Sequence, residues 1–318
     1  MKPPYQVTEK ILGLIAAISE QLGAIKATHL SKPPTELRKK NRIKTIQSSL
    51  EIEGNTLTEE QITALLEDKK VIAPQKDIIE VQNAIKVYEQ ISNYNACNIK
   101  DILKAHKLLM QGLVNSAGKF RTKNVGIVKG SKVSHMAPAG GMVNGLMNDL
   151  FNYLKNDKDI PLIKSCVFHY ELEFIHPFVD GNGRMGRLWQ TVILMQQYPV
   201  FEYLPVEQLI KAQQAEYYEA LSLSDKAGNS TLFIEFMLEI IRESLGQLLL
   251  SQNRTLTVHD RVELFNDKVK QTEFSRKDYL QYFKEISPAT ASRDLKWAVD
   301  KNIILKTGDK RKTRYRYH

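Results

Sequence analysis

Apolar side chains recur at every third or fourth position through most of the chain, which is the period of an α-helix with one buried face. In residues 5–28, for example, Ile11, Ile15, Ile18 and Leu22 follow this spacing. The same pattern predicts helices at 36–53, 58–68, 77–92, 99–113, 142–155, 161–175, 183–198, 206–222 and 229–251. We therefore expect an all-α fold over most of the chain.

Two parts of the chain depart from this pattern. Between Val114 and Gly141 the helical period is lost, and 125–128 and 131–135 look like short extended segments, which predicts an exposed hairpin or flap. At the C-terminal end the pattern predicts three helices and then two short strands, at 257–270, 275–284, 288–301, 303–306 and 313–317. That order is typical of a winged helix-turn-helix, so we expect such a module at 257–318 after a linker near 251–257.

The composition is that of a soluble globular protein with more than one domain. The chain has 318 residues, of which 42% are hydrophobic and 25% are charged, so extensive disorder is excluded. No apolar run is long enough for a membrane span, and the N-terminus lacks the apolar segment of a signal peptide. The two cysteines, Cys97 and Cys166, form no CxxC pair, which argues against a disulfide framework and fits a cytoplasmic location.

The positive charge is concentrated near the C-terminus. Residues 257–318 contain 15 Lys and Arg but only 9 Asp and Glu, so six of the nine excess positive charges lie there. An anionic partner of this module and an ordinary solvated basic surface explain the excess equally well.

The densest chemistry lies in the loop His176-Pro-Phe-Val-Asp-Gly-Asn-Gly-Arg-Met-Gly-Arg187. Glycines directly before a helix let backbone N–H groups converge, and the helix N-terminus adds partial positive charge, so the segment suits an anion. Arg184 and Arg187 add two guanidinium groups on one helix face, which suits a polyphosphate. Asp180 is an oxygen ligand for a magnesium ion between phosphates. His176 is the group of this loop that can accept a proton near neutral pH.

Simpler explanations of this loop account for less of it. Asp-Gly-Asn-Gly alone is often only a turn, and an isolated histidine often belongs to the core. A calcium-binding EF-hand loop fails because Met185 and Thr191 stand where glycine and glutamate are needed. A Walker A loop fails because no Gly-Lys-Ser/Thr follows. The acid, the base, the glycines and the arginines together favour a catalytic site.

The same loop matches the signature of the Fic (filamentation induced by cAMP) domain, His-Pro-Phe-x-Asp-Gly-Asn-Gly-Arg-x-x-Arg, at every specified position. The surrounding helices, the flap and its approach at Gly118-Lys-Phe-Arg121 are also similar to the family, and the resemblance covers roughly 36–250. It implies an N-terminal helical region at 1–95, a Fic-type helical core with a β-hairpin flap at 96–251, and the winged helix at 257–318.

The resemblance implies an enzyme that transfers AMP from ATP to a Ser, Thr or Tyr hydroxyl of a target protein. His176 would be the general base, and Asp180 would hold Mg²⁺ between the α- and β-phosphates. A family variant with lysine at the first arginine transfers the γ-phosphate instead, so Arg184 favours AMP transfer. The residues that the resemblance places on the nucleotide are Gly181, Asn182, Gly183, Arg184, Met185, Gly186, Arg187, Ser134, His135 and Tyr217.

Two parts of this assignment concern residues outside the loop. The flap from Lys132 to Met136 resembles the strand to which Fic targets add an edge strand. Tyr217 occupies a family position close to adenine, although an ordinary core tyrosine explains it as well.

A second motif, Ser49-Leu-Glu-Ile-Glu53-Gly54, resembles the inhibitory motif of the family, Ser/Thr-x-x-x-Glu-Gly/Asn. Its helix is expected at about 36–54, with Ser49 and Glu53 on one face. The resemblance implies that Glu53 pairs with Arg187 and keeps the γ-phosphate of ATP from it, and we expect Ser49 to donate to the Glu53 carboxylate. Taken alone, a solvated glutamate at a helix end is the ordinary explanation. In some relatives the same glutamate helps to remove AMP from modified targets. The sequence does not decide whether AMP transfer or AMP removal dominates.

The C-terminal module has two kinds of partner in prospect. Residues 287–297 place polar and basic side chains on one face, as a recognition helix in a DNA major groove does. A basic wing would be formed by Lys310, Arg311, Lys312, Arg314 and Arg316. Winged helices also bind proteins. The sequence leaves open whether the protein forms a homodimer. The rival function is a DNA-binding regulator that uses the Fic fold as a nucleotide sensor. The complete catalytic set argues against it, because a sensor has no need of His176.

Overall fold

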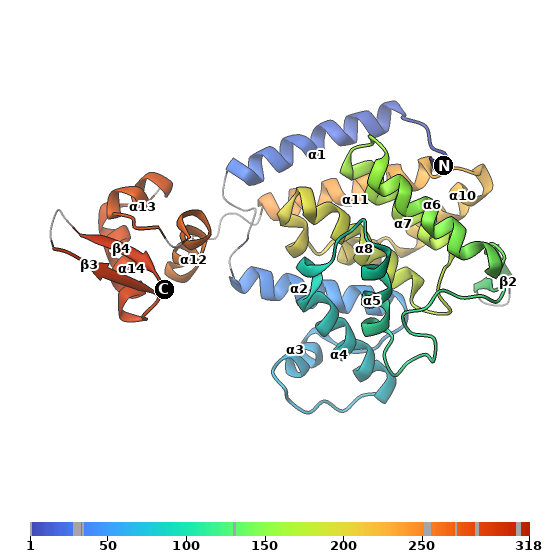
Figure 1. The fold of residues 1–318 in the computed structure, drawn as a ribbon, viewed down its shortest axis with the longest axis horizontal. Helices are drawn as coiled ribbons and strands as arrows, with labels where there is room; N and C mark the ends of the chain where they lie inside the picture. Colours follow the sequence, from blue (N-terminus) through green and yellow to red (C-terminus); the bar gives the residue numbers. More distant parts are fainter. Residues whose placement is uncertain are drawn as a thin grey trace. The chain divides into compact units, whose positions relative to one another are not determined.

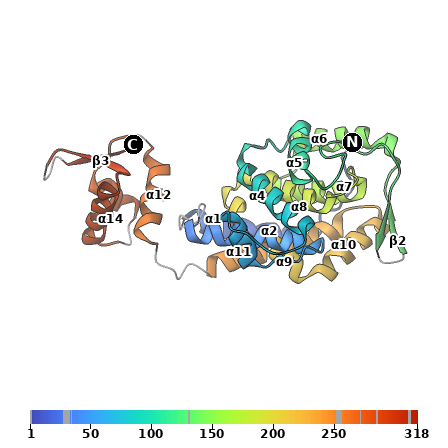
Figure 2. The ribbon, with the colours of Figure 1, turned by 90° about the horizontal axis from the view of Figure 1, so that it is seen from below.

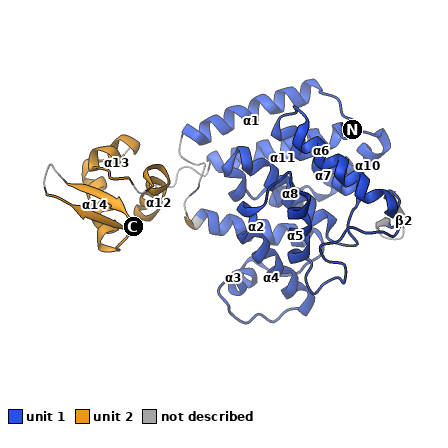
Figure 3. Cartoon of the chain, in the orientation of Figure 1, with its two compact units in different colours: residues 1–33, 37–250 blue, residues 34–36, 251–318 orange. Residues whose placement is uncertain are grey.

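The computed structural model describes residues 2–27, 33, 35–129, 132–250, 256–270, 272–283, 286–309 and 313–318. The chain forms two compact units (Figure 3), one of Met1–Pro33 with Leu37–Leu250 and one of Pro34–Glu36 with Ser251–His318. Each unit has its own hydrophobic core. Helices from both sides of residue 95 contribute to the core of the first unit.

The first unit is helical apart from one hairpin (Figures 1 and 2), which confirms the predicted all-α fold. The helices that run from its N-terminus to its C-terminus are α1 Glu9–Ala27, α2 Thr35–Ile52, α3 Glu59–Leu66, α4 Gln75–Glu89, α5 Ile99–Leu109, α6 Val143–Asn156, α7 Pro161–Ile175, α8 Asn182–Gln197, α9 Val206–Ala212, α10 Gln214–Ala227 and α11 Thr231–Leu250. Short 3-10 helices occupy Ile91–Asn93, Gly140–Met142 and Pro199–Tyr203. In the part of the chain that the structure describes, no helix is both long and apolar enough to cross a membrane.

Helices α7 and α8 lie at the centre of the first unit and pack along each other (Figure 1). Most residues of α7 are buried, and every α8 residue from Arg184 to Leu194 is buried. A helix that is buried all round needs neighbours on every side, and α6, α11 and α5 supply some of them. The loop between α7 and α8 is therefore held at both ends by the core.

The chain departs from the prediction at 206–222, where two helices replace the single helix that we expected. Gln213 leaves helical geometry, with φ −116° and ψ 41°, between α9 and α10. Its amide donates to Glu243 of α11, and Gln214 donates to the carbonyl of Ile52 at the end of α2. The sequence has no glycine or proline at this break. We attribute the break instead to these contacts with α11 and with the end of α2.

The predicted flap is present as an antiparallel hairpin of β1 Gly126–Lys129 and β2 Lys132–Met136 (Figure 2). The pairing shifts by one residue between Ile127 and Val128, and β2 contacts α10. Ser134 and His135 lie in β2, but their side chains are outside the described part of the structure. Their contacts with the nucleotide stay a prediction.

The second unit contains three helices and a two-stranded antiparallel sheet, in the predicted order. These elements are α12 Val258–Val269, α13 Arg276–Tyr282, α14 Pro288–Asp300, β3 Ile304–Thr307 and β4 Arg314–Tyr317. A buried ion pair joins α12 to α14, since Arg261 donates to both carboxylate oxygens of Asp294 at 2.6 and 2.9 Å. The winged-helix assignment stays a prediction, and Lys310, Arg311, Lys312 and most of the expected linker lie outside the described residues.

Candidate active site

His176 directly follows the last residue of α7 and has a left-handed backbone conformation, with φ 49° and ψ 58°. This conformation is uncommon for a residue other than glycine and needs support from its surroundings. Arg121, a buried residue, gives that support by donating to the carbonyls of His176 at 2.7 Å and of Ile175 at 3.0 Å. It also donates to the carbonyls of Lys123 and Pro138, so one guanidinium joins the end of α7 to the segments on either side of the flap.

The ring of His176 is oriented by its own helix. Its Nδ1 atom lies 3.3 Å from the carbonyl oxygen of Glu173. A carbonyl oxygen only accepts hydrogen bonds, so this contact favours the tautomer in which Nδ1 carries the proton. Nε2 then keeps the lone pair that a general base needs.

Replacing Arg121 should therefore weaken both the fold and the site. We expect Arg121→Ala to lower the free energy of unfolding by about 3 kcal/mol, because buried carbonyls lose a charged donor. Arg121→Lys should recover only part of this loss, since an ammonium cannot span all four carbonyls. Urea unfolding monitored by circular dichroism measures the difference, and a loss below about 1 kcal/mol would contradict the clamp.

The N-terminal turn of α8 has the backbone geometry that the predicted anion site requires. Gly181 is the N-cap residue of α8 and has φ 86°. The first N–H groups of a helix have no partner within the helix, and glycine has no side chain that could cap them, so they are left to bind an anion. A Cβ atom at Gly181 would lie 2.8 Å from Sδ of Met110, so only glycine fits. Asn182 closes the loop, because its side chain accepts from the N–H of Phe178 at 2.8 Å and donates to the Phe178 carbonyl at 3.0 Å.

Asp180 lies at the exposed edge of this loop. Its Oδ1 atom accepts from the N–H of Gly181 at 2.6 Å and from Nη2 of Arg184 at 3.1 Å, and its side chain is 49% exposed. Its carbonyl accepts from Nε2 of His106 at 3.0 Å, while Nδ1 of His106 accepts from the N–H of Gly118 at 2.8 Å. Burial lowers the pKa of His106 to about 4, so this histidine is a neutral support of the loop.

The two arginines of the signature lie in the first two turns of α8, and both are buried. Nη1 of Arg184 lies 3.1 Å from Oε1 of Glu80 on α4. Nη2 of Arg187 lies 2.7 Å from Oε1 of Glu53, at the end of α2. The N-terminal helices thus supply one acid to each arginine.

Glu53 lies directly on the first turn of α8. A Cβ atom at Gly183 would be 2.5 Å from Oε1 of Glu53, so this carboxylate covers the first turn of α8. Burial is the largest single effect on Arg187 and disfavours its charge, but the interactions with Glu53, Tyr217 and Glu173 together outweigh it and raise the pKa of Arg187 above its usual value. The Glu53 side chain is 30% exposed, so the pair is buried on the arginine side and open on the glutamate side.

Ser49 has a different partner from the one that we expected. Its hydroxyl accepts from Nε of Arg187 at 3.2 Å, and its carbonyl accepts from Nη2 at 2.9 Å, whereas we predicted a bond to Glu53. The buried guanidinium needs acceptors for its N–H groups, and α2 offers two at this residue. Ser49 therefore orients the arginine of the pair.

Three further residues assigned to the nucleotide are buried in the core. Met185 is fully buried, and a Cβ atom at Gly186 would lie 2.6 Å from the ring of His169. Tyr217 is 1% exposed, and its hydroxyl lies 3.0 Å from Nε2 of His169. Their contacts with the nucleotide, including that of Tyr217 with adenine, stay predictions.

The sequence reasoning missed four residues that shape the site. Glu80, His106 and Glu173 were not singled out, and Arg121 was seen only as part of the approach to the flap. Glu80 and His106 lie on the buried faces of α4 and α5, so a polar residue at an apolar helix position was the available signal.

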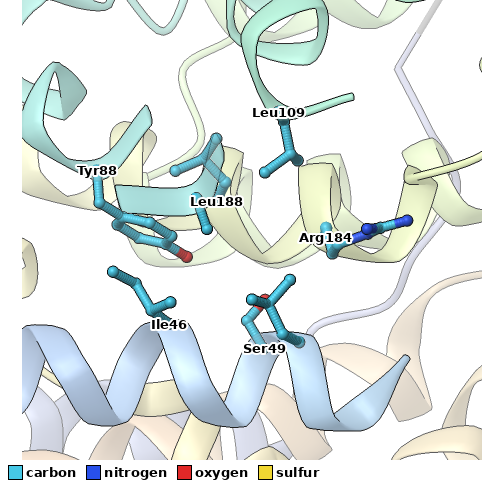
Figure 4. Close-up of a pocket in the computed structure, with 8 residues that line it drawn as sticks. Ile46, Ser49, Tyr88, Leu109, Arg184 and Leu188 are labelled. Atoms are coloured by element: carbon cyan, nitrogen blue, oxygen red, sulfur yellow. The ribbon is translucent and has the colours of Figure 1, made fainter. Parts of the chain in front are cut away.

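A small pocket lies behind the arginines, among residues of α2, α4, α5 and α8 (Figure 4). Its lining includes Ile46, Ser49, Tyr88, Leu109, Arg184 and Leu188. Five of the eight lining residues, which also include Leu50 and Ala84, are aliphatic, and such a lining does not suit a triphosphate. The N-terminal turn of α8 therefore remains the candidate site.

Known proteins place the chain in a family. Residues 96–194 match the Fic/DOC family. A Fic family protein from Desulfovibrio desulfuricans, known from its crystal structure, is 40% identical, with 100% of this chain and 98% of that chain covered and a TM-score of 0.77. The chain belongs to the Fic family. This result confirms the resemblance that the loop indicated.

More distant Fic relatives agree with this assignment. A Drosophila erecta relative named Protein adenylyltransferase Fic is 30% identical over 243 residues, which cover 73% of this chain and 47% of the relative. Fic-1 from C. elegans is 22% identical, with 77% of this chain and 76% of that chain covered and a TM-score of 0.60, and shows a shared fold. The chain spans about half the length of the curated relatives that it matches.

Proposed function

We propose that this Fic protein transfers AMP from ATP to a Ser, Thr or Tyr hydroxyl of a target protein. The observation that carries the proposal is the position of His176, whose Nδ1 atom lies 3.3 Å from the Glu173 carbonyl oxygen, next to a helix N-terminus with two buried arginines. The name of the Drosophila relatives supports the same activity. A cytoplasmic location remains part of the proposal and rests on the cysteine usage.

In this reaction His176 takes the proton of the target hydroxyl as its oxygen attacks the α-phosphorus of ATP. The bond between the α-phosphorus and the bridging oxygen breaks, and pyrophosphate leaves with that oxygen. The N–H groups of the first turn of α8 stabilise the negative charge that develops on the phosphoryl oxygens. Arg184 and Arg187 bind the β- and γ-phosphates.

Asp180 would hold the Mg²⁺ ion that accompanies ATP. Among the described residues no group of three or more His, Cys, Asp or Glu could hold a metal ion. A single half-exposed carboxylate nevertheless fits, because Mg²⁺ commonly binds one or two carboxylates together with substrate phosphates. The ion would supply positive charge to the phosphates when bound.

We further propose that the conformation described here is inhibited. The Glu53 carboxylate covers the first turn of α8, to which we assign the phosphates, and Arg187 is already paired. ATP can then bind productively only after Glu53 moves away. The same carboxylate could orient water for AMP removal, so the proposal includes both AMP transfer and AMP removal.

Product analysis tests the reaction type. Incubation of the full-length protein with ATP and Mg²⁺ should release pyrophosphate in the same molar amount as AMP appears on protein. Release of ADP together with phosphorylated protein would replace the proposal with γ-phosphate transfer. Tight ATP binding without either product from the uninhibited protein would favour the nucleotide-sensor alternative.

We propose DNA as the partner of the second unit, because its helix α14 presents a basic face. Arg293 and Lys296 are exposed, while Leu295 and Ala298 of the same helix are buried. Arg276 of α13 donates to Ser292 at 2.9 Å, which adds a third cation beside this face. The buried pair between Arg261 and Asp294 keeps α14 in this orientation.

Removing the two exposed cations of α14 should weaken DNA binding. We expect Arg293→Ala combined with Lys296→Ala to lower the affinity for a short DNA duplex at least tenfold at low salt and to reduce the salt slope by about 2. Fluorescence anisotropy measures both quantities. Lys268→Ala with Lys270→Ala, which removes the same charge at the end of α12, is the control. Equal loss in both variants, or no binding of the unaltered protein at low salt, would contradict this partner.

A further inference from the structure

A second acid lies against the same turn of α8 as Glu53. Glu173 is a half-buried residue of α7, and its Oε1 atom is 3.4 Å from the Cβ positions of both Gly183 and Gly186. Glu53 approaches the Gly183 position from α2. Among the hydrogen bonds and ion pairs of the described residues, none involves the Glu173 carboxylate.

The groups around Glu173 include two further carboxylates and one cation. The ionisable groups that interact electrostatically with Glu173 are Glu53 at the end of α2, Arg187 on α8, and Tyr217, Tyr218 and Asp225 on α10. Arg187 is the cation of this set, and it is already paired with Glu53 at 2.7 Å. Burial first, and then the charge of Glu53, raise the pKa of Glu173 to about 7, against a smaller opposing effect of Arg187.

We infer that Glu173 is a proton-linked positioning residue of the nucleotide site, which takes up a proton from solvent when a triphosphate binds. This inference rests on the proposed function. A triphosphate on the first turn of α8 brings more negative charge than the Glu53 carboxylate that it displaces. Ionised Glu173 would repel it, whereas the protonated carboxyl has an O–H group that can donate to a phosphate oxygen.

The sign of the pH dependence follows from this linkage. If the bound state requires protonated Glu173, the complex holds one proton more than the free protein at high pH. The affinity for ATP is then constant below the pKa of the free protein and falls about tenfold per pH unit above it. Removal of Glu53 takes away a repelling charge, so the fall should begin at lower pH in a Glu53→Gly background.

The experiment uses the full-length Glu53→Gly, His176→Ala protein as the parent, because it is freed from inhibition and does not turn over. Calorimetric titration with ATP and Mg²⁺ from pH 6 to 9 gives the affinity at each pH. Titration at pH 8 in two buffers of different ionisation enthalpy gives the proton count. We expect about one proton to be taken up per ATP bound. This proton binds to the protein and not to ATP, because the phosphates are already ionised at pH 8 and stay so.

Two substitutions in α7 assign the proton. Adding Glu173→Gln should abolish the uptake and flatten the pH dependence of the affinity, since the amide keeps the shape of the side chain without titrating. Adding Glu171→Gln is the matched control, because burial and the charge of Asp225 raise the pKa of Glu171 to about 7 as well. This control should behave like the parent.

The outcomes separate this inference from the proposed function. The parent's pH dependence persisting in Glu173→Gln would overturn the inference, as would proton uptake near zero in the parent. The second result suffices even if Glu173→Gln does not fold. No ATP binding at any pH would instead overturn the proposed function.

Discussion

His176→Ala is expected to lower AMP transfer about 10²–10⁴-fold, which is the usual contribution of a positioned general base. ATP should still bind with nearly the parent affinity, because the imidazole moves a proton and holds no phosphate. The loop should also persist, since Arg121 binds the backbone carbonyl of residue 176, which alanine retains.

The measurement is a rate of self-modification together with a Kd for ATP, both in the Glu53→Gly background. His259→Ala, which changes an exposed histidine of the second unit, is the control and should leave both values unchanged. Transfer by His176→Ala within about tenfold of its parent would contradict the role of His176 as the base.

Glu53→Gly is expected to raise self-modification at least tenfold. The substitution removes the carboxylate from the first turn of α8 and frees Arg187 for the γ-phosphate. A tenfold gain requires only about 1.4 kcal/mol. Breaking a fully buried pair involves about 3–5 kcal/mol, and the 30% exposure of the Glu53 side chain reduces that figure without bringing it near zero.

Two comparisons distinguish inhibition from a contact of the fold. Glu51→Gly removes an acid from the same helix end, where Glu51 pairs with Lys211 at 3.5 Å, and should leave the rate unchanged. Arg187→Ala should not increase the rate, because it removes the partner of Glu53 and the phosphate ligand together. An unchanged rate in a folded Glu53→Gly protein would mean that Glu53 is only a helix-end glutamate.

The sequence predicted the elements that depend on local pattern. The helical period located α7 and α8, and the twelve residues from His176 to Arg187 identified the family because their chemistry is contiguous. The pairing of Glu53 with Arg187 was expected only through the resemblance, and the structure describes it at 2.7 Å.

What the sequence did not predict depends on contacts between distant segments. Glu80 meets Arg184, and His106 meets the carbonyl of Asp180, only because α4 and α5 pack beside α8. The same reason explains the break at Gln213, where no local signal exists. Ser49 was placed on the correct face but given the wrong partner, because the demand of a buried guanidinium for acceptors appears only once α8 is in place.

The position of the label in ATP tests the central claim most directly. The full-length Glu53→Gly protein is incubated with Mg²⁺ and with ATP labelled at either the α-phosphate or the γ-phosphate, and the label on protein is counted. AMP transfer predicts that only the label at the α-position appears on protein. It also predicts no labelled protein when His176→Ala is added to the Glu53→Gly protein. Label from the γ-position would contradict AMP transfer and show that the site transfers the terminal phosphate.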